Sequence, residues 1–131
     1  MPRKIMIGLK RDTLKLVPHD PNWKILFSEE RQRIKQAIGQ MILRIEHVGS
    51  TAIPTISAKP IIDIAIEIPT YEHGYACVQP LTHLGYLYKG ANGIEGRHYF
   101  RTNAELVKFH IHLFPHGHEK WRNHLLFRNY L

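Results

Sequence analysis

Hydrophobic and polar residues alternate most regularly in two segments, residues 61–68 and 107–114, and this pattern predicts two strands. In the first segment one face is formed by four isoleucines, and the other face carries Ile61, Asp63, Ala65 and Glu67. In the second segment one face is again apolar, and the other carries Lys108, His110, His112 and Phe114. Each strand therefore has one face for a hydrophobic core and a second face on which chemically active groups can gather.

Apolar residues recur at helical spacing in the segment from Trp23 to about Gly39, which predicts an amphipathic helix that ends at the glycine. Further helices are expected over 71–84 and from about 118 to 131. Shorter strands are expected over 42–48, 86–88 and 97–102, and an extended arm or edge strand over residues 1–17. This order of elements predicts an α+β fold, a mixed sheet with flanking helices.

The length of 131 residues indicates one domain spanning 1–131, because a chain of this size builds one hydrophobic core. No apolar run approaches the roughly 20 residues that a membrane span needs, so we expect no membrane partner. The single cysteine, Cys77, cannot form an internal disulfide, and this favours a cytoplasmic location.

The formal charge of +7 is concentrated near the start of the chain, where residues 1–44 contain ten Lys and Arg against four Asp and Glu. Such a surplus attracts partners that carry phosphate groups. The basic residues do not alternate with aromatic residues that could stack on bases, so nucleic acid is not favoured. The simpler alternative is a solvated basic surface without a specific partner.

A tight turn of small residues, Gly49-Ser50-Thr51-Ala52, follows the strand expected over 42–48. Backbone N–H groups in such a turn can approach a phosphate closely, and the hydroxyl groups add donors. Twelve residues lie between Ser50 of this turn and Asp63, which is on the polar face of the next strand. A carboxylate at that place can hold a divalent cation against phosphate oxygens. We therefore predict phosphate binding at Gly49, Ser50 and Thr51, with Asp63 as metal ligand and catalytic residue.

Two blocks of sequence around this turn resemble the GrpB family: Ile45 to Pro54, which reads IEHVGSTAIP, and Ala58 to Ile64, which reads AKPIIDI. The resemblance extends to three further stretches, residues 17–23, 109–113 and 121–131. It implies the nucleotidyltransferase fold, whose enzymes combine a Gly-Ser turn with two acidic residues one apart on a strand and a third carboxylate on a later strand.

The match to that superfamily pattern is incomplete. Gly49 and Ser50 match the turn and Asp63 matches the first carboxylate, but Ala65 stands at the second position. Glu67 lies about 13 Å further along the strand, too far to share one ion with Asp63. The departure at Ala65 puts catalytic activity in doubt.

Two histidines occupy the later strand where the third acid is expected. His110 and His112 lie about 7 Å apart on one face, so both imidazoles can converge with Asp63 on one metal ion. This ligand set suits zinc, manganese or iron better than magnesium, which prefers oxygen ligands. The alternative is that the pair lies on a solvated face or forms local hydrogen bonds.

Three cationic residues are further candidates for binding a substrate phosphate. Lys59 precedes the Asp63 strand, and Arg97 and Arg101 lie on the same side of their own strand. For each of them the alternative is a solvated side chain.

We therefore expect a protein that binds a nucleotide or another phosphorylated small molecule; if it is catalytic, the reaction is metal-assisted nucleotidyl transfer with Mg, Mn or Zn. The first alternative is a non-catalytic binding or accessory module, because GrpB-like domains also occur fused to dephospho-coenzyme A kinase. The second is a metal-dependent hydrolase that uses His110 and His112. Family members usually continue past the helix that ends at Leu131, so the domain is expected to be naturally short, completed by another subunit as a homo-oligomer, or a fragment.

Overall fold

The computed structural model describes residues 15–102 and 108–130, which form a five-stranded mixed sheet and three α-helices. The helices are α2 (Asn22–Ile38), α3 (His73–His83) and α4 (Glu119–Tyr130), with two short 3-10 helices, η2 (Gly39–Met41) and η3 (Ser50–Ala52). The strands are β1 (Arg44–Val48), β2 (Ile61–Ile68), β3 (Tyr86–Tyr88), β4 (His98–Thr102) and β5 (Lys108–Pro115). The expected fold class, a mixed sheet with flanking helices, is confirmed.

The sheet has the strand order β1-β2-β5-β4-β3, with β2 and β5 parallel at its centre and the other pairs antiparallel. The register across β2 and β5 pairs Asp63 with His110 and Ala65 with His112. Because residues paired in this way project from the same face, the polar residues predicted on the two strands do meet.

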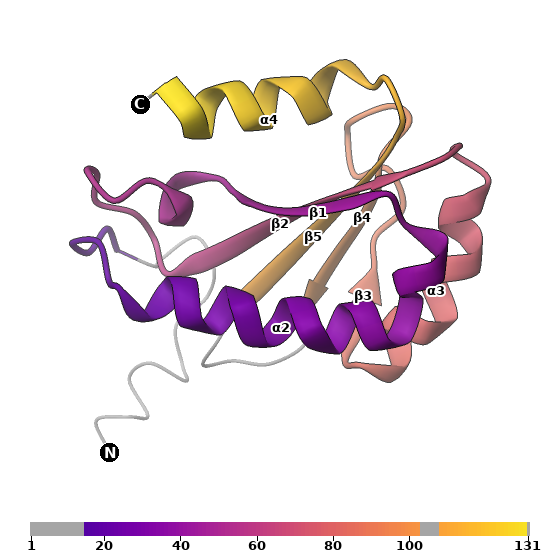
Figure 1. The fold of residues 1–131 in the computed structure, drawn as a ribbon, viewed down its shortest axis with the longest axis horizontal. Coiled ribbons are helices and arrows are strands. Elements are labelled where there is room, and N and C mark those ends of the chain that lie inside the picture. Colours follow the sequence, from indigo (N-terminus) through magenta and orange to yellow (C-terminus); the bar gives the residue numbers. More distant parts are fainter. Residues whose placement is uncertain (1–14, 103–107, 131) are drawn as a thin grey trace.

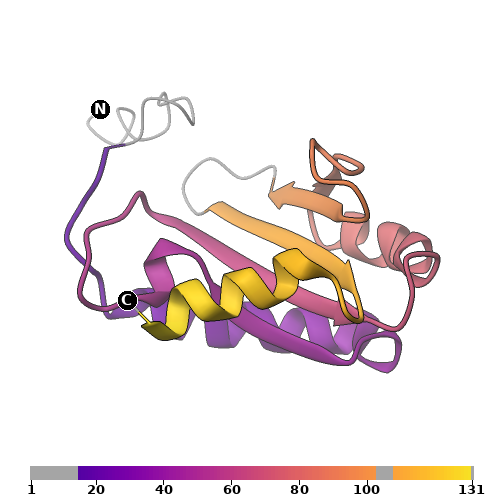
Figure 2. The ribbon, with the colours of Figure 1, turned by 90° about the horizontal axis from the view of Figure 1, so that it is seen from above.

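Helices α2 and α3 cover one face of the sheet and α4 lies on the other (Figure 1). The main core lies on the α2–α3 face and includes the four isoleucines of β2 with Phe109, Ile111 and Leu113 of β5. A smaller cluster of Val48, Ala65, Phe114 and Trp121 lies beneath α4. Figure 2 shows α4 over the β1–β2 side of the sheet, so its cover of the polar face is partial. The two-faced strands predicted from the alternation are confirmed.

Some expected boundaries shift. The chain continues after α2 as the 3-10 helix Gly39–Met41, and for that reason β1 begins at Arg44 and not at Ile42. Most of the expected N-terminal arm, and Val107 of the expected last strand, lie outside the described residues; within them Val17 forms an isolated bridge with Ala58. In the part of the chain that is described, no helix has the length and apolar character to cross a membrane.

The imidazole of His98 on β4 is fully buried and holds α3 against the sheet. Its Nε2 donates to the carbonyl oxygen of Tyr71 at 2.8 Å, which leaves Nδ1 to accept from the Tyr88 hydroxyl at 2.6 Å. Gly74 of α3 backs onto this ring, and a Cβ atom at that position would overlap the imidazole.

The contact between Gly74 and His98 predicts that Gly74→Ala destabilises the fold by about 2 kcal/mol or more, since the ring is held by two hydrogen bonds and cannot move aside. Chemical denaturation measures this change. Gly39→Ala is the matched control, because Gly39 has helical dihedral angles and its added Cβ would meet only Lys35 at 3.8 Å. An equal loss of stability in both variants would contradict the packing argument.

Candidate functional site

The turn after β1 brings the chain directly over the carboxylate of Asp63. Val48 is paired with Asp63 across β1 and β2, so the next residue, Gly49, begins the bend above it. Gly49 has φ 76° and ψ −175°, a conformation that is essentially restricted to glycine. A Cβ atom on Gly49 would lie 2.5 Å from Oδ2 of Asp63. The small-residue bend and the strand aspartate are therefore in contact.

A cavity of about 340 Å³ opens beside this contact. Its walls bring together four residues predicted from the sequence, namely Ser50, Lys59, Asp63 and His110, with Leu16, Ala58 and Ile61 as apolar neighbours. The cavity thus combines a hydroxyl donor, an ammonium group and an imidazole around one carboxylate, a set of groups that can bind a phosphate.

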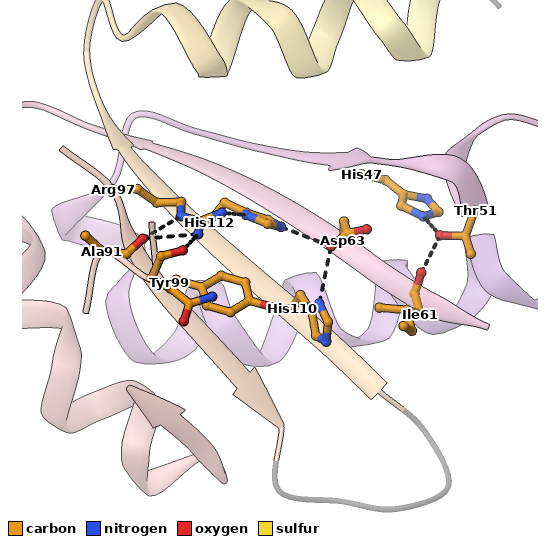
Figure 3. Close-up of polar contacts among 10 residues, drawn as sticks. His47, Thr51, Ile61, Asp63, Ala91, Arg97, Tyr99, His110 and His112 are labelled. Atoms are coloured by element: carbon orange, nitrogen blue, oxygen red, sulfur yellow. Dashed lines mark hydrogen bonds and ion pairs between the residues drawn. The ribbon is translucent and has the colours of Figure 1, made fainter. Parts of the chain in front are cut away.

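Asp63 is held by the two histidines of β5 (Figure 3). Nε2 of His112 lies 3.0 Å from its Oδ1, and Nδ1 of His110 lies 3.7 Å from the same oxygen. Behind His112, a terminal nitrogen of Arg97 lies 3.1 Å from Nδ1 of that ring. Asp63, His112 and Arg97 therefore form a continuous chain of polar contacts.

The direction of the hydrogen bonds in this chain follows from the chemistry of arginine. A guanidinium group only donates, so Nδ1 of His112 accepts from Arg97 and Nε2 carries the proton that is donated to Asp63. The rest of the Arg97 guanidinium donates to the carbonyl oxygens of Ala91 and Asn92, and the residue is buried. Arg97 was expected to contact a bound anion directly. In the structure four of its five N–H donors are engaged, one on His112 and three on backbone carbonyl oxygens, so anion binding by Arg97 stays a prediction.

Asp63, His110 and His112 converge as predicted, but as a hydrogen-bonded cluster. Both ring nitrogens of His112 are engaged, so metal binding would require it to release Asp63 or Arg97. Ala65, which faces His112 across the strands, supplies no second carboxylate. Over the described residues no group of three His, Cys, Asp or Glu side chains is placed to hold a metal ion. In this arrangement the side chains do not fit a divalent metal, and the expected metal site stays a prediction.

Thr51 turns away from the cavity beside Asp63. Its side chain is fully buried, and its hydroxyl donates to the carbonyl oxygen of Ile61 at 3.1 Å. The hydroxyl oxygen of Thr51 lies 3.0 Å from Nε2 of His47 and accepts a hydrogen bond from that ring, because its own proton is already donated to Ile61. His47 and Thr51 thus fasten the bend to the start of β2, whereas phosphate binding by Thr51, expected from the sequence, finds no support in this position.

Burial lowers the pKa of His47 from 6.5 to about 4, with the nearby cations adding to the effect and Asp63 opposing it. The ring also stacks on Phe27 of α2, with centroids 4.9 Å apart. His47 is therefore neutral near neutral pH, with its proton on Nε2 and a lone pair on Nδ1.

Three features of the site are not evident from the sequence. Tyr99 of β4 lies between Arg97 and Arg101, whose guanidinium carbons are 4.5 and 5.8 Å from its ring centroid. Its hydroxyl lies 2.9 Å from Nδ1 of His110. His124 of α4 packs its ring 5.1 Å from that of His112, and burial lowers the pKa of His124 to about 4. The position of Tyr99 between two arginines at alternating positions was the one signal in the sequence that could have indicated this cluster.

The chain is similar in sequence to proteins of one family. The family model described as GrpB protein matches residues 13–131. The UPF0157 protein YqkA of Bacillus subtilis is 38% identical over 118 residues, 90% of this chain and 34% of that protein. The glutamate-rich protein GrpB of Alkalihalophilus pseudofirmus is 35% identical over 131 residues, 96% of this chain and 75% of that protein. The chain thus spans about a third of the first relative and three quarters of the second.

Part of the chain also resembles a larger enzyme. A dephospho-CoA kinase of Mycolicibacterium paratuberculosis is 38% identical over 81 residues, which are 60% of this chain and 20% of that protein.

Solved structures agree with the family assignment. The crystal structure of a conserved GrpB protein from Enterococcus faecalis has a TM-score of 0.82 and 34% identity, and the match covers 89% of this chain and 72% of that one. Cid1 in complex with the UTP analogue UMPNPP has a TM-score of 0.53 and 14% identity, covering 88% of this chain and 34% of Cid1. At that identity the likeness shows the fold alone.

The contact between Gly49 and Asp63 predicts that Gly49→Ala lowers stability by about 2 kcal/mol or more, because it combines backbone strain with a clash against the carboxylate. Gly85→Ala is the matched control: its φ of 105° imposes similar strain, but its Cβ would have no atom within 4 Å. Denaturant titrations of both variants measure the difference. If Gly85→Ala is as destabilising as Gly49→Ala, the close approach to Asp63 contributes nothing.

The buried position of His47 predicts a pH dependence of folding. Its pKa is lower in the folded protein than in the unfolded chain, so the unfolded chain binds the proton first as the pH falls from about 6.5 towards 4. Stability is therefore lost over that window, and His47→Gln is expected to lose less of it. Urea denaturation at several pH values measures how the free energy of unfolding changes with pH in the wild type and in His47→Gln. His83→Gln, at an exposed position on α3, controls for the substitution itself. Parallel slopes for wild type and His47→Gln would contradict the assignment.

Proposed function

Since the chain belongs to the GrpB family and has the nucleotidyltransferase fold, we propose that it binds a nucleotide or another phosphorylated small molecule in the cavity beside Gly49 and Asp63. The observation that supports this most strongly is the contact of the Gly49 backbone with the Asp63 carboxylate. It places the bend, with the hydroxyl of Ser50, at the wall of a cavity that also includes a lysine. A phosphate there receives donors from the bend and positive charge from Lys59.

Asp63 is the residue that we propose to act on a reacting ligand. Its Oδ1 accepts from His112, whose ring is fixed by Arg97, so the carboxylate has a defined orientation towards the cavity. Nucleotidyl transfer by the route of the superfamily uses a divalent cation, which stabilises charge on the phosphate oxygens. No step is assigned to such a cation, because the His112 hydrogen bonds and Ala65 leave no preformed set of ligands for it.

A second candidate function, a non-catalytic binding or accessory module, is favoured by Ala65. This residue is completely buried beneath α4, at the strand position where the superfamily pattern has its second acid. The partial match to dephospho-CoA kinase is consistent with a domain that serves a neighbouring enzyme. Turnover separates the two functions: a binding module retains the nucleotide unchanged, and a transferase converts it.

We expect UTP or ATP to bind the purified chain, and we expect Lys59→Gln to weaken binding about tenfold, because a charge-assisted hydrogen bond to phosphate is lost. Lys89→Gln is the matched control, since Lys89 is also an exposed lysine but lies outside this cavity. Calorimetric titration measures both variants, with and without Mg²⁺ or Mn²⁺.

Asp63→Asn provides the second readout. If the metal prediction holds, the dependence of binding on Mn²⁺ disappears in this variant, and elemental analysis of untagged protein shows bound metal in the wild type only. Equal nucleotide affinity for Lys59→Gln, Lys89→Gln and wild type would remove the cavity as the binding site.

A further inference from the structure

A second cavity of about 330 Å³ lies on the opposite side of the Ser50–Ala52 turn. Ser50 lines the first cavity, whereas Thr51 and Ala52 line the second. Asp63 lines the first cavity and is not among the residues that line the second. The polar groups that face it come from β1, from α2 and its approach, and from the end of α4: His19, Lys24, Glu46, His47 and Arg128. No part of the proposed function uses this cavity.

His47 lines this cavity and has a hydrogen-bond acceptor that is not used elsewhere in the described structure. Figure 3 shows the contacts of Thr51 with His47 and with Ile61. Because the Thr51 hydroxyl donates to the Ile61 carbonyl oxygen, Nε2 of His47 is the donor to Thr51 and Nδ1 carries the lone pair. Nδ1 makes no hydrogen bond with any residue that the structure describes. The proton on Nε2 cannot readily move to Nδ1, because Thr51 has already given its own proton to the Ile61 carbonyl. A ligand that satisfies Nδ1 must therefore bring a donor.

Positive charge is supplied by Lys24. The negative charge of Glu46 is balanced by two arginines, since Arg128 lies 2.7 Å from its Oε1 and Arg44 lies 2.9 Å from its Oε2. Burial works to raise the pKa of Glu46, but the hydrogen bonds from these two arginines outweigh it and the pKa is lowered. Lys24 makes no ion pair within residues 15–102 and 108–130, so its charge is available to a ligand.

His19 adds a polar atom that lacks a partner. Its Nδ1 is buried and has no hydrogen bond within the described part of the chain, while its ring packs edge-on against Trp23. A buried ring nitrogen without a partner is unfavourable, and a ligand that bonds to it removes that cost. A group that can both donate and accept satisfies this nitrogen in either tautomer of His19.

The geometry points to a second ligand site, specific for a monoprotonated phosphate group, between His19, Lys24 and His47. The phosphate O–H donates to Nδ1 of His47, the anionic oxygens face the ammonium group of Lys24, and the His19 ring turns so that its buried Nδ1 gains a hydrogen bond to the phosphate. This combination of negative charge and a proton donor distinguishes hydrogenphosphate from sulfate, which has the same shape but no proton to donate at mildly alkaline pH.

Inorganic phosphate and sulfate are the probes, both dianionic at mildly alkaline pH. We expect phosphate to shift the imidazole NMR signals of His19 and His47 along a saturating curve, and to bind about fivefold or more tightly than sulfate. Lys24→Gln weakens phosphate binding several-fold, whereas Lys35→Gln, at an exposed position further along α2, leaves it unchanged. His47→Phe keeps the ring stacked on Phe27 and abolishes the preference for phosphate over sulfate.

Three results would overturn the site: His19 and His47 signals that do not respond to phosphate, equal affinity for the two anions in the wild type, or equal effects of Lys24→Gln and Lys35→Gln. All three are measured without His47→Phe and therefore hold even if that variant does not fold. Lys59→Gln separates this site from the proposed nucleotide cavity, because it leaves the His19 and His47 responses intact. Loss of those responses in Lys59→Gln would assign the phosphate to the first cavity instead.

Discussion

The close approach of the Gly49 backbone to the Asp63 carboxylate is the constraint on which the rest of the site depends. It arises from the antiparallel register of β1 and β2, which pairs Val48 with Asp63 and makes the following residue the start of the bend. Only glycine permits both the backbone conformation and the absence of a side chain at that point. The amides and hydroxyl of the turn are therefore held next to the one carboxylate of the cavity.

The position of that carboxylate is set from the other side by His112 and Arg97. Arg97 cannot accept a proton, so it selects the tautomer of His112 that donates to Asp63. The positive charge of Arg97 belongs to the same hydrogen-bonded network as the Asp63 carboxylate and balances its negative charge across the His112 ring. An acid at position 65 would stand across from His112 and add negative charge to this network. The methyl group of Ala65 instead packs with Phe114 and Trp121 in the small cluster beneath α4. Ala65 thus contributes hydrophobic contact with the covering helix.

The sequence was sufficient to predict the two-faced strands, the turn and four of the residues that line the first cavity, namely Ser50, Lys59, Asp63 and His110. These depend on short-range patterns: alternation in β2 and β5, and small residues between Val48 and Ile53. The role of Arg97 could not be predicted, because it depends on which residues of β4 and β5 lie opposite each other and on how the 89–96 loop presents its carbonyl groups. The sequence prediction that Thr51 binds phosphate finds no support for a similar reason. Its place in the turn was correct, but the direction of its hydroxyl depends on the Ile61 carbonyl, ten residues later.

The same three-residue turn separates two different chemical environments. Ser50 lines a cavity with one carboxylate, one lysine and one imidazole, and the next residue, Thr51, lines one with two imidazoles, a lysine and a glutamate that is paired with arginine. A 3-10 turn directs consecutive side chains in different directions, so adjacent residues can serve opposite sides of a thin wall. The hydroxyl of Thr51 is bonded to His47 on one side and to the first residue of β2 on the other. His47 is thereby connected through one hydroxyl group to the start of the strand that carries Asp63 two residues further along.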